Sequence, residues 1–384
     1  MTRSGLVTAV SGVVLVMAAV LLGYPELLAV GLTCGAVLAL AAVWRLLRPD
    51  LSVRRTIEPQ RVEVGEHARS RLNITNIRRR RTPPIAAYEL IDGKRIPIAL
   101  PSLRGGQSFA TTQPLPTARR GKHVIPPLTL GYSDPFRLIQ VDIEHGTPST
   151  LWVYPRVHYL AALRSGGMRD LDGSTSATSP QGGVAFHSLR DYQAGDDWRL
   201  IHWRSTARTD RLMVKHNVVP DEVQHLVVLD TSAAAYSDGE AFEEAVRIAA
   251  SWCVAAAREG CVVRVATTGG ADAQYVPTGR ARGQPVAVLD LLTEVTLSDL
   301  DAGLGALGSL ISTEHSTAVG VVTGRAGTAH LGSLPAVRSR VASLSLVRVG
   351  GGQLDIEIPL RGVLGVSAGD SDQLAARWNE LIRR

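Results

Sequence analysis

Two long uncharged segments at the amino terminus constrain the fold of this chain more than any other feature. No Asp, Glu, Lys or Arg occurs in the 22 residues from Ser4 to Pro25 or in the 18 residues from Leu27 to Trp44. A helix needs roughly 17–25 predominantly apolar residues to span the hydrocarbon core of a bilayer. Within lipid, the backbone polar groups must pair with one another, which favours helices. These segments therefore predict a transmembrane two-helix hairpin over residues 1–48.

The arginines around the hairpin predict its orientation. Arg3 precedes the first segment, and the connector Tyr24-Pro25-Glu26 carries no Lys or Arg. Four arginines follow the second segment, namely Arg45, Arg48, Arg54 and Arg55. By the positive-inside rule we expect a multi-pass protein of the cell membrane whose termini and soluble domains are cytoplasmic. A cleaved secretory signal is the alternative, but a second apolar segment follows at once and no small-x-small cleavage site lies close after Leu22.

Residues 51–155 have a sequence pattern typical of a small antiparallel β domain. Short alternating apolar runs are separated by Gly, Pro, Asn and Asp, and in the run from Arg69 to Ile77 the side chains of Leu72 and Ile74 share one face. Residues 124–130 and 150–154 look similar. This spacing of strands and turns predicts a β-sandwich.

Four consecutive arginines, Arg78 to Arg81, follow the run that ends at Ile77. Contact with acidic lipid or nucleic acid is one interpretation. A solvated hairpin loop is the other, because arginine supplies nearly all the positive charge of this chain, whose formal net charge is +6. No aromatic residues are interleaved, so a platform for stacking bases is missing and we expect no nucleic-acid partner.

The segment of residues 156–219 combines a linker with an unusual cassette. Ser165 to Gly183 is rich in Gly, Ser and Thr and reads as a flexible connector. Phe186 to His216 alternates Arg and Asp around Trp198 and Trp203. Guanidinium planes stack on tryptophan faces and pair with carboxylates, so this cassette could fix a domain junction or present a docking surface.

The cassette resembles the signature of a bacterial family, the domain of unknown function 58. The pattern is carried by Phe186, Leu189, Arg190, Tyr192, Gly195, Asp196, Arg199, Ile201, Trp203, Ala207 and Arg208. Upstream, Arg120-Gly121, Ser133-Asp134-Pro135-Phe136 and Val153-Tyr154-Pro155 are similar to further family features in the same order.

The resemblance implies a function as well as a fold. Family members are typically anchored by two membrane helices, carry a von Willebrand factor A-like domain and are linked to a MoxR-type AAA+ ATPase. We therefore expect a non-enzymatic accessory or adaptor protein that docks such an ATPase or its client protein. The partner-binding residues expected within the cassette are Arg190, Tyr192, Gly195, Asp196, Arg199, Trp203 and Arg208.

Residues 220–384 read as an α/β domain. Apolar β-branched runs at residues 225–230, 261–268, 317–323 and 341–349 alternate with helical stretches such as Glu240 to Gly260. Such alternation predicts a largely parallel sheet covered by helices, in agreement with the A-like domain that the resemblance implies. The whole chain is thus expected to be an α+β multidomain protein.

The metal-binding motif that the resemblance implies is incomplete in this sequence. In that domain class Asp-x-Ser-x-Ser on the first loop holds a divalent ion, with a Thr and an Asp from later loops. Asp230 and Ser232 match, but Ala234 replaces the second Ser, and no acid follows Thr323 in Gly324-Arg325. A hard cation needs several oxygen ligands. We therefore expect no cofactor, with Mg²⁺ at this degenerate site as the alternative, and we expect Asp230 to cap the following turn with help from Ser232.

No catalytic residues are expected, and the chain is not expected to be an enzyme. The Gly303–Gly308 string matches a dinucleotide fingerprint, but no strand precedes it and no acid lies about 20 residues on. Ser367 lies in a nucleophile-elbow string, which makes a membrane-bound serine hydrolase the alternative function. That mechanism needs a later His, and His330 is the last one, so a loop serine is expected. His202 is expected to be structural.

Overall fold

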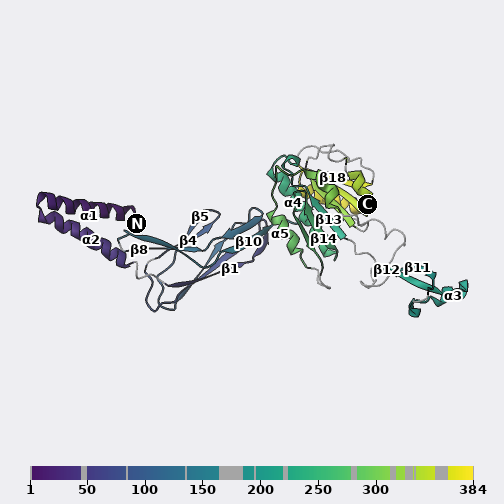
Figure 1. Cartoon of the computed structure of the whole chain (residues 1–384), viewed down its shortest axis with the longest axis horizontal. Helices are drawn as coiled ribbons and strands as arrows, with labels where there is room; N and C mark the ends of the chain where they lie inside the picture. Colours follow the sequence, from purple (N-terminus) through teal and green to yellow (C-terminus); the bar gives the residue numbers. More distant parts are fainter. Residues whose placement is uncertain are drawn as a thin grey trace. The chain divides into compact units, whose positions relative to one another are not determined.

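The computed structural model describes two compact units, Met1–Tyr154 and Pro155–Arg384 (Figure 1). The described residues are 2–44, 50–83, 85–134, 136–163, 185–193, 196–218, 224–277, 283–311, 317–324, 332, 334–350 and 362–383. The predicted linker and Gly195 therefore lie outside them. The mixed α and β character and the two apolar amino-terminal helices are confirmed.

The helical hairpin consists of α1 (Arg3–Leu22) and α2 (Pro25–Trp44). Gly23 ends α1 in the left-handed conformation, at φ 69°, and its N–H donates to the carbonyl of Ala19. The helices touch at Gly31, where an added Cβ would lie 2.6 Å from Cγ2 of Val16, whereas nothing lies within 4 Å of such an atom on Gly35.

The hairpin leaves its apolar surface exposed. Leucine, valine and methionine side chains point outward along α1, and the same holds for much of α2. A core helix of a soluble protein would bury this surface against other elements. By length and composition, both helices could cross a membrane.

Among the described residues after the hairpin, the first unit has ten strands in three small sheets. The strands are β1 (Leu51–Glu58), β2 (Arg61–Glu63), β3 (Arg69–Asn76), β4 (Ile85–Ile91), β5 (Lys94–Ile98), β6 (Ser108–Pro114), β7 (Gly121–Ile125), β8 (Leu128–Ser133), β9 (Gln140–His145) and β10 (Ser149–Tyr154). The sheet orders are β1-β3-β6, β2-β10-β7 and β5-β4-β8-β9. The alternation predicted for β3 is present, because Leu72 and Ile74 are buried while Arg71 and Asn73 are exposed.

A charged pair is buried inside this β unit. The Nη2 atom of Arg55 lies 3.3 Å from Oε1 of Glu89, and the two side chains are 4% and 0% exposed. Ser70 donates to the same carboxylate oxygen, and Nη1 of Arg55 donates to the carbonyls of Ile125 and Pro126. Desolvation lowers the pKa of Arg55, and the Glu89 charge opposes that shift.

The second unit is built on a six-stranded sheet of order β15-β14-β13-β16-β17-β18, in which only β15 is antiparallel to its neighbour. The strands are β13 (Gln224–Leu229), β14 (Val262–Thr267), β15 (Asp272–Tyr275), β16 (Thr317–Thr323), β17 (Ser343–Val349) and β18 (Val363–Ala368). The helices are η3 (Ala233–Ala235), α4 (Gly239–Arg258), α5 (Val286–Glu294), η4 (Gly303–Ala306), α6 (Leu307–Leu310), α8 (Leu334–Arg338) and α9 (Ser371–Arg383). This is the largely parallel sheet that the alternating runs predicted.

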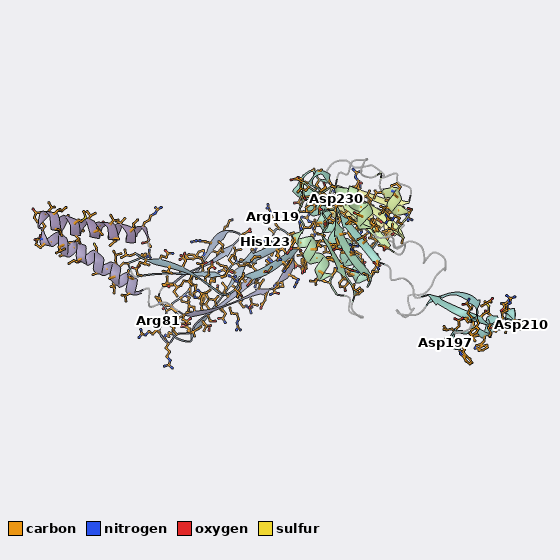
Figure 2. All side chains as sticks on the ribbon, viewed as in Figure 1. Arg81, Arg119, His123, Asp197, Asp210 and Asp230 are labelled. Carbon is orange, nitrogen blue, oxygen red and sulfur yellow. The ribbon has the colours of Figure 1, made fainter. Side chains whose placement is uncertain are left out.

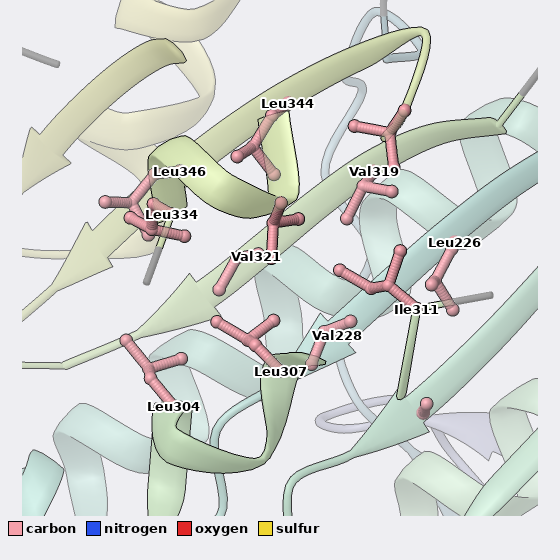
Figure 3. Close-up of a cluster of buried hydrophobic side chains, with 13 residues drawn as sticks. Leu226, Val228, Leu304, Leu307, Ile311, Val319, Val321, Leu334, Leu344 and Leu346 are labelled. Carbon is pink, nitrogen blue, oxygen red and sulfur yellow. The ribbon is translucent and has the colours of Figure 1, made fainter. Parts of the chain in front are cut away.

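Alternate residues of the central strands supply two cores. Val228 of β13 and Val321 of β16 join a cluster with η4, α6 and α8 on one face, where Leu304, Leu307 and Leu334 pack against them (Figure 3). On β16, Gly320 points to the other face, where an added Cβ would meet the ring of Trp252 on α4 at 2.8 Å. The central strands are therefore buried on both faces, as parallel strands usually are.

Residues 155–163 form a strap that packs on α4 and α9. Nε1 of Trp378 donates to the carbonyl of Ala161 at 2.8 Å, and the amide of Asn379 bonds both Ala161 N and Tyr159 O. Trp378 also packs edge-on against Trp252, with ring centroids 5.0 Å apart. Backbone segments more than 200 residues apart in sequence are thereby joined.

The cassette forms a small hairpin within the second unit. It contains β11 (Ala185–Asp191), η2 (Trp198–Leu200), α3 (Trp203–Thr209) and β12 (Met213–Val218), with β11 and β12 antiparallel. His202 is the N-cap of α3, where its Nδ1 accepts from the backbone N–H of Ser205. His202 thereby stabilises the start of α3.

His225 should make the second unit sensitive to acid. It is buried on β13, and desolvation lowers its pKa from 6.5 to about 4. Below pH 6.5 the unfolded chain takes up a proton that the folded chain does not, so stability falls as the pH is lowered toward 4. We expect a loss of about 3 kcal/mol over this range, absent in His225→Leu. Denaturant unfolding followed by tryptophan fluorescence tests this, and parallel pH profiles for the two proteins would contradict it.

Candidate functional site

Three adjacent parallel strands end at one edge of the sheet and deliver polar side chains there. Asp230 follows β13, Thr268 follows β14, and Thr323 is the last residue of β16. The order β14-β13-β16 places Asp230 between the two threonines. The carboxyl ends of parallel strands are where α/β folds bind their ligands, and Asp230 is labelled in Figure 2.

Asp230 is buried, and its carboxylate oxygens and backbone polar groups are all hydrogen-bonded. Its Oδ1 accepts from the backbone N–H of Ser232 at 3.0 Å, and its Oδ2 accepts from the Thr323 hydroxyl at 2.7 Å. Its carbonyl accepts from the hydroxyl of Tyr236, and its N–H donates to Val322. This carboxylate therefore fixes the conformation of the loop after β13.

A second carboxylate, Asp301, joins the edge from the loop between α5 and η4. Its Oδ2 accepts from the hydroxyls of Thr231, at 2.6 Å, and Thr268. The Thr268 hydroxyl also lies 3.4 Å from Oδ1 of Asp230, so one hydroxyl lies between the two carboxylates. We call Asp230, Thr231, Thr268, Asp301 and Thr323 the edge cluster.

The pKa values of the two carboxylates of the edge cluster are shifted in opposite directions. Desolvation raises the pKa of Asp230, and the nearby charge of Asp301 adds to that effect. For Asp301 desolvation also acts upward, but hydrogen bonds from Thr231, Thr268 and Gly303 outweigh it and hold the pKa below its usual range. Asp301 therefore keeps its negative charge more readily, and it is the less buried of the two.

The loop that carries Asp301 requires a glycine. Gly303 has φ +62°, and its N–H donates to Oδ1 of Asp301 at 2.9 Å. An added Cβ would lie 3.2 Å from Cβ of Ser232 and 3.3 Å from Oδ1 of Asp230. The left-handed backbone and the close approach both favour glycine. Gly303 follows a helix, so the string Gly303–Gly308 lacks the strand that a dinucleotide site requires.

The edge cluster is rich in the oxygen donors that Mg²⁺ prefers. However, all four carboxylate oxygens of Asp230 and Asp301 already accept hydrogen bonds from protein donors. Within the described part of the chain, no group of three or more His, Cys, Asp or Glu side chains could hold a metal ion. Each carboxylate oxygen of the edge cluster is therefore hydrogen-bonded to the protein without an ion.

One expectation about this edge was wrong. Asp230 does accept from the following turn, but the side chain of Ser232 makes no capping hydrogen bond to η3, and only its backbone N–H takes part. No acid follows Thr323, as the sequence indicates, but a second acid, Asp301, comes from an earlier loop. A hydrogen-bonded pair of loops, with Ala233 N donating to Ser298 O and Ser298 N to Thr231 O, brings that loop to the edge.

The expected partner-binding residues of the cassette lie on the hairpin, apart from Gly195, which is outside the described residues. Tyr192 follows β11 and its N–H donates to Leu212 O, while Oδ2 of Asp196 accepts from Gln193 N at 2.9 Å. Arg190 lies on β11 and Arg199 on η2. On α3, Trp203 and Arg208 are exposed, and so is the nearby Trp198 of η2. The hairpin thus presents aromatic and cationic side chains to its surroundings.

Ser367 lies on strand β18, not in the expected loop, because the apolar run Val363–Ala368 pairs with β17.

A different serine, Ser371, lies within hydrogen-bonding distance of a histidine. Nε2 of His158, on the strap, lies 2.9 Å from Oγ of Ser371, and its Nδ1 lies 3.3 Å from Asp372. This order resembles a catalytic triad. Ser371 is only 2% exposed and is the first residue of α9, so the arrangement joins the strap to the helix without an open path for a substrate.

The fold and this edge define a multidomain α+β protein with two apolar amino-terminal helices and a parallel α/β domain. Residues 188–376 match the model of a family described as "Protein of unknown function DUF58". The chain belongs to the DUF58 family, as the cassette residues predicted.

A curated relative is similar to about half of this chain. YeaD, an uncharacterized protein of Bacillus subtilis, is 27% identical over 220 residues, which are 53% of this chain and 53% of the relative. The alignment therefore spans about half the length of that curated relative.

Solved structures show only a faint likeness. The CARDB domain of a Pyrococcus furiosus protein, 19% identical, matches 27% of this chain and 94% of its own length with a TM-score of 0.22. A beta-glucosidase from Listeria innocua, 15% identical, matches 27% of this chain and 17% of its own length with a TM-score of 0.16. At these TM-scores, the likeness supports no conclusion about fold or function.

Proposed function

We propose that this chain is a non-enzymatic, membrane-anchored adaptor that binds a protein partner at the edge cluster. The observation that carries the proposal is the pair of carboxylates, Asp230 and Asp301, gathered with three threonine hydroxyls at the carboxyl edge of a parallel sheet. Asp301 is only partly buried and retains its charge, so it can accept a cationic group from a partner.

The partner we propose is a MoxR-type AAA+ ATPase or its client, as the family resemblance implies. The domain would act as a von Willebrand factor A-like module. Its largely parallel sheet and the aspartate after its first strand, β13, support that interpretation. The cassette, with exposed Trp203 and Arg208, is a second surface for the same partner. Tryptophan and arginine are the side chains most enriched at binding hot spots.

The proposed location is the cell membrane, with both helices spanning it and the soluble units in the cytoplasm. The exposed apolar surface of α1 and α2 supports insertion. Arg3 at the start of α1 and the arginines that follow α2, with no Lys or Arg in the connector, support the orientation.

Asp230→Ala and Asp301→Ala should each weaken partner binding by about tenfold or more, the size of an interface hot spot. Asp301→Ala removes the accessible charge. Asp230→Ala frees the Ser232 N–H and the Thr323 hydroxyl, at a cost of about 1–3 kcal/mol, which changes the loop without unfolding the domain. Co-purification from membranes in mild detergent, with quantified AAA+ ATPase, measures the effect.

Glu259→Ala is the matched control, because it removes one exposed carboxylate after the last residue of α4, away from the edge cluster. Its affinity should equal that of the unmodified chain. Equal affinity for the Asp301 variant would contradict the proposed surface. Saturable Mg²⁺ binding lost in the Asp230 variant would assign the cluster to a metal instead. Covalent labelling of Ser371 or Ser367 by a serine-reactive probe would contradict the non-enzymatic part.

A further inference from the structure

Two loops of the β unit lie at the end of the helical hairpin where the chain enters and leaves it. At the start of α1, Thr2 N donates to the carbonyl of Leu138 and its hydroxyl donates to the carbonyl of Arg137. After α2, the carbonyl of Asp50 accepts from Ile77 N. The loop that carries Arg78 to Arg81 therefore begins beside Asp50, six residues after the end of α2.

The arginine loop is held in one conformation by a buried asparagine. The Nδ2 of Asn76 donates to the carbonyls of Arg80 and Leu103, and its Oδ1 accepts from Arg78 N. Gly105 lies so close that an added Cβ would be 2.7 Å from the carbonyl oxygen of Arg78. With the backbone polar groups turned inward, the four arginine side chains are left exposed.

The charge at this end is predominantly positive, although Asp50 is an exposed carboxylate beside the arginine loop. Six exposed arginines lie on its loops, namely Arg78, Arg79, Arg80, Arg81, Arg104 and Arg137, and we call them the basic collar. The carboxylate of Asp134 is turned inward, where it accepts from the N–H groups of Phe136 and Ile139. Ile77 and Phe136 are nevertheless 61% and 54% exposed, so apolar side chains accompany the collar.

We propose that the basic collar binds anionic phospholipid headgroups of the membrane that α1 and α2 span. This proposal rests on the proposed membrane anchoring. Guanidinium groups pair with phosphate in a planar fork, and the exposed Ile77 and Phe136 suit the boundary between headgroups and acyl chains. The β unit is thereby held against the bilayer surface.

The position of the basic collar favours lipid over nucleic acid as its ligand. Figure 2 shows Arg81 at the end of the β unit that bears the helices, and Arg119 at the opposite end. A collar beside the helix ends is within reach of headgroups as soon as the hairpin is inserted. The run of four arginines has no interleaved aromatic side chains to stack bases.

The test uses the full chain in a neutral detergent, titrated with phosphatidylglycerol or phosphatidylcholine and followed by native mass spectrometry. The unmodified chain should prefer phosphatidylglycerol. Arg79→Gln/Arg81→Gln should weaken that binding roughly 25-fold, since each arginine near an anionic surface contributes about fivefold. Arg69→Gln/Arg119→Gln removes the same charge from the opposite end and should leave the affinity unchanged.

Equal affinity for the two lipids, or equal losses in both double variants, would overturn the proposal. Duplex DNA binding that is lost in Arg79→Gln/Arg81→Gln, without any lipid preference, would assign the collar to nucleic acid and also overturn it. Alkaline extraction of membranes distinguishes a failure of the membrane anchoring from a failure of lipid binding by the collar. If the chain is released, the anchoring itself fails, whereas a retained chain without lipid preference refutes the collar alone.

Discussion

Glu89→Ala should lower the free energy of unfolding of the β unit by about 3–5 kcal/mol. The substitution leaves the Arg55 guanidinium buried without its counter-charge, at a side-chain exposure of 4%. Two carbonyls, those of Ile125 and Pro126, still accept from it but cannot neutralise it. Desolvation already disfavours the charged form of Arg55, and Glu89 is the group that opposes this effect.

A double variant separates the net contribution of the Arg55–Glu89 pair to stability from the cost of leaving one buried charge unpaired. Arg55→Met/Glu89→Leu removes both charges and should be far less destabilising than Glu89→Ala, because a buried pair is often replaceable by apolar side chains of similar volume. The matched surface control is Glu58→Ala, which breaks the exposed pair with Arg71 and should cost less than about 1 kcal/mol. Denaturant unfolding of the full chain in detergent measures all three, and similar losses for the two single variants would refute the argument.

Trp378→Ala should destabilise the second unit by about 3–5 kcal/mol, the usual cost of truncating a large buried aromatic side chain. Trp378 is fully buried, packs edge-on against Trp252 and donates through Nε1 to the carbonyl of Ala161. Its loss opens a cavity between α4 and α9 and releases a hydrogen bond that fastens the strap.

The strap gives this prediction a second readout. In Trp378→Ala, limited proteolysis should cut within residues 155–163 faster than in the unmodified chain, because local opening precedes cleavage. Trp378→Phe keeps an aromatic ring but not the N–H donor, so its loss should be intermediate. Trp198→Ala removes an exposed ring and should change stability by less than about 0.5 kcal/mol. An unchanged cleavage rate for Trp378→Ala would show that the strap is fastened by other contacts.

The elements of this chain were largely predictable because their signals are local. The absence of charge along α1 and α2, the alternation in β3 and the apolar runs of β13 and β16 each specify an element from neighbouring residues. The family assignment also followed from a compact set of residues within the cassette.

The candidate site was predictable only in part. Asp230 stands directly after a strong strand signal, so its place at the sheet edge could be inferred. Asp301 has no comparable motif, and it reaches the edge only because its loop pairs with the loop after β13. Similarly, no string in the sequence links His158 to Ser371, which are 213 positions apart.

By itself, the sequence determined that two apolar helices begin the chain, that strands and helices follow in this order, and that the chain carries the DUF58 signature. These properties depend on side-chain periodicity and charge within short windows. Only the tertiary structure decided which carboxylate joins Asp230, which strand holds Ser367 and which loops surround the hairpin. Those outcomes depend on strand order and loop contacts between distant residues, whose energies come from packing that no short window of sequence contains.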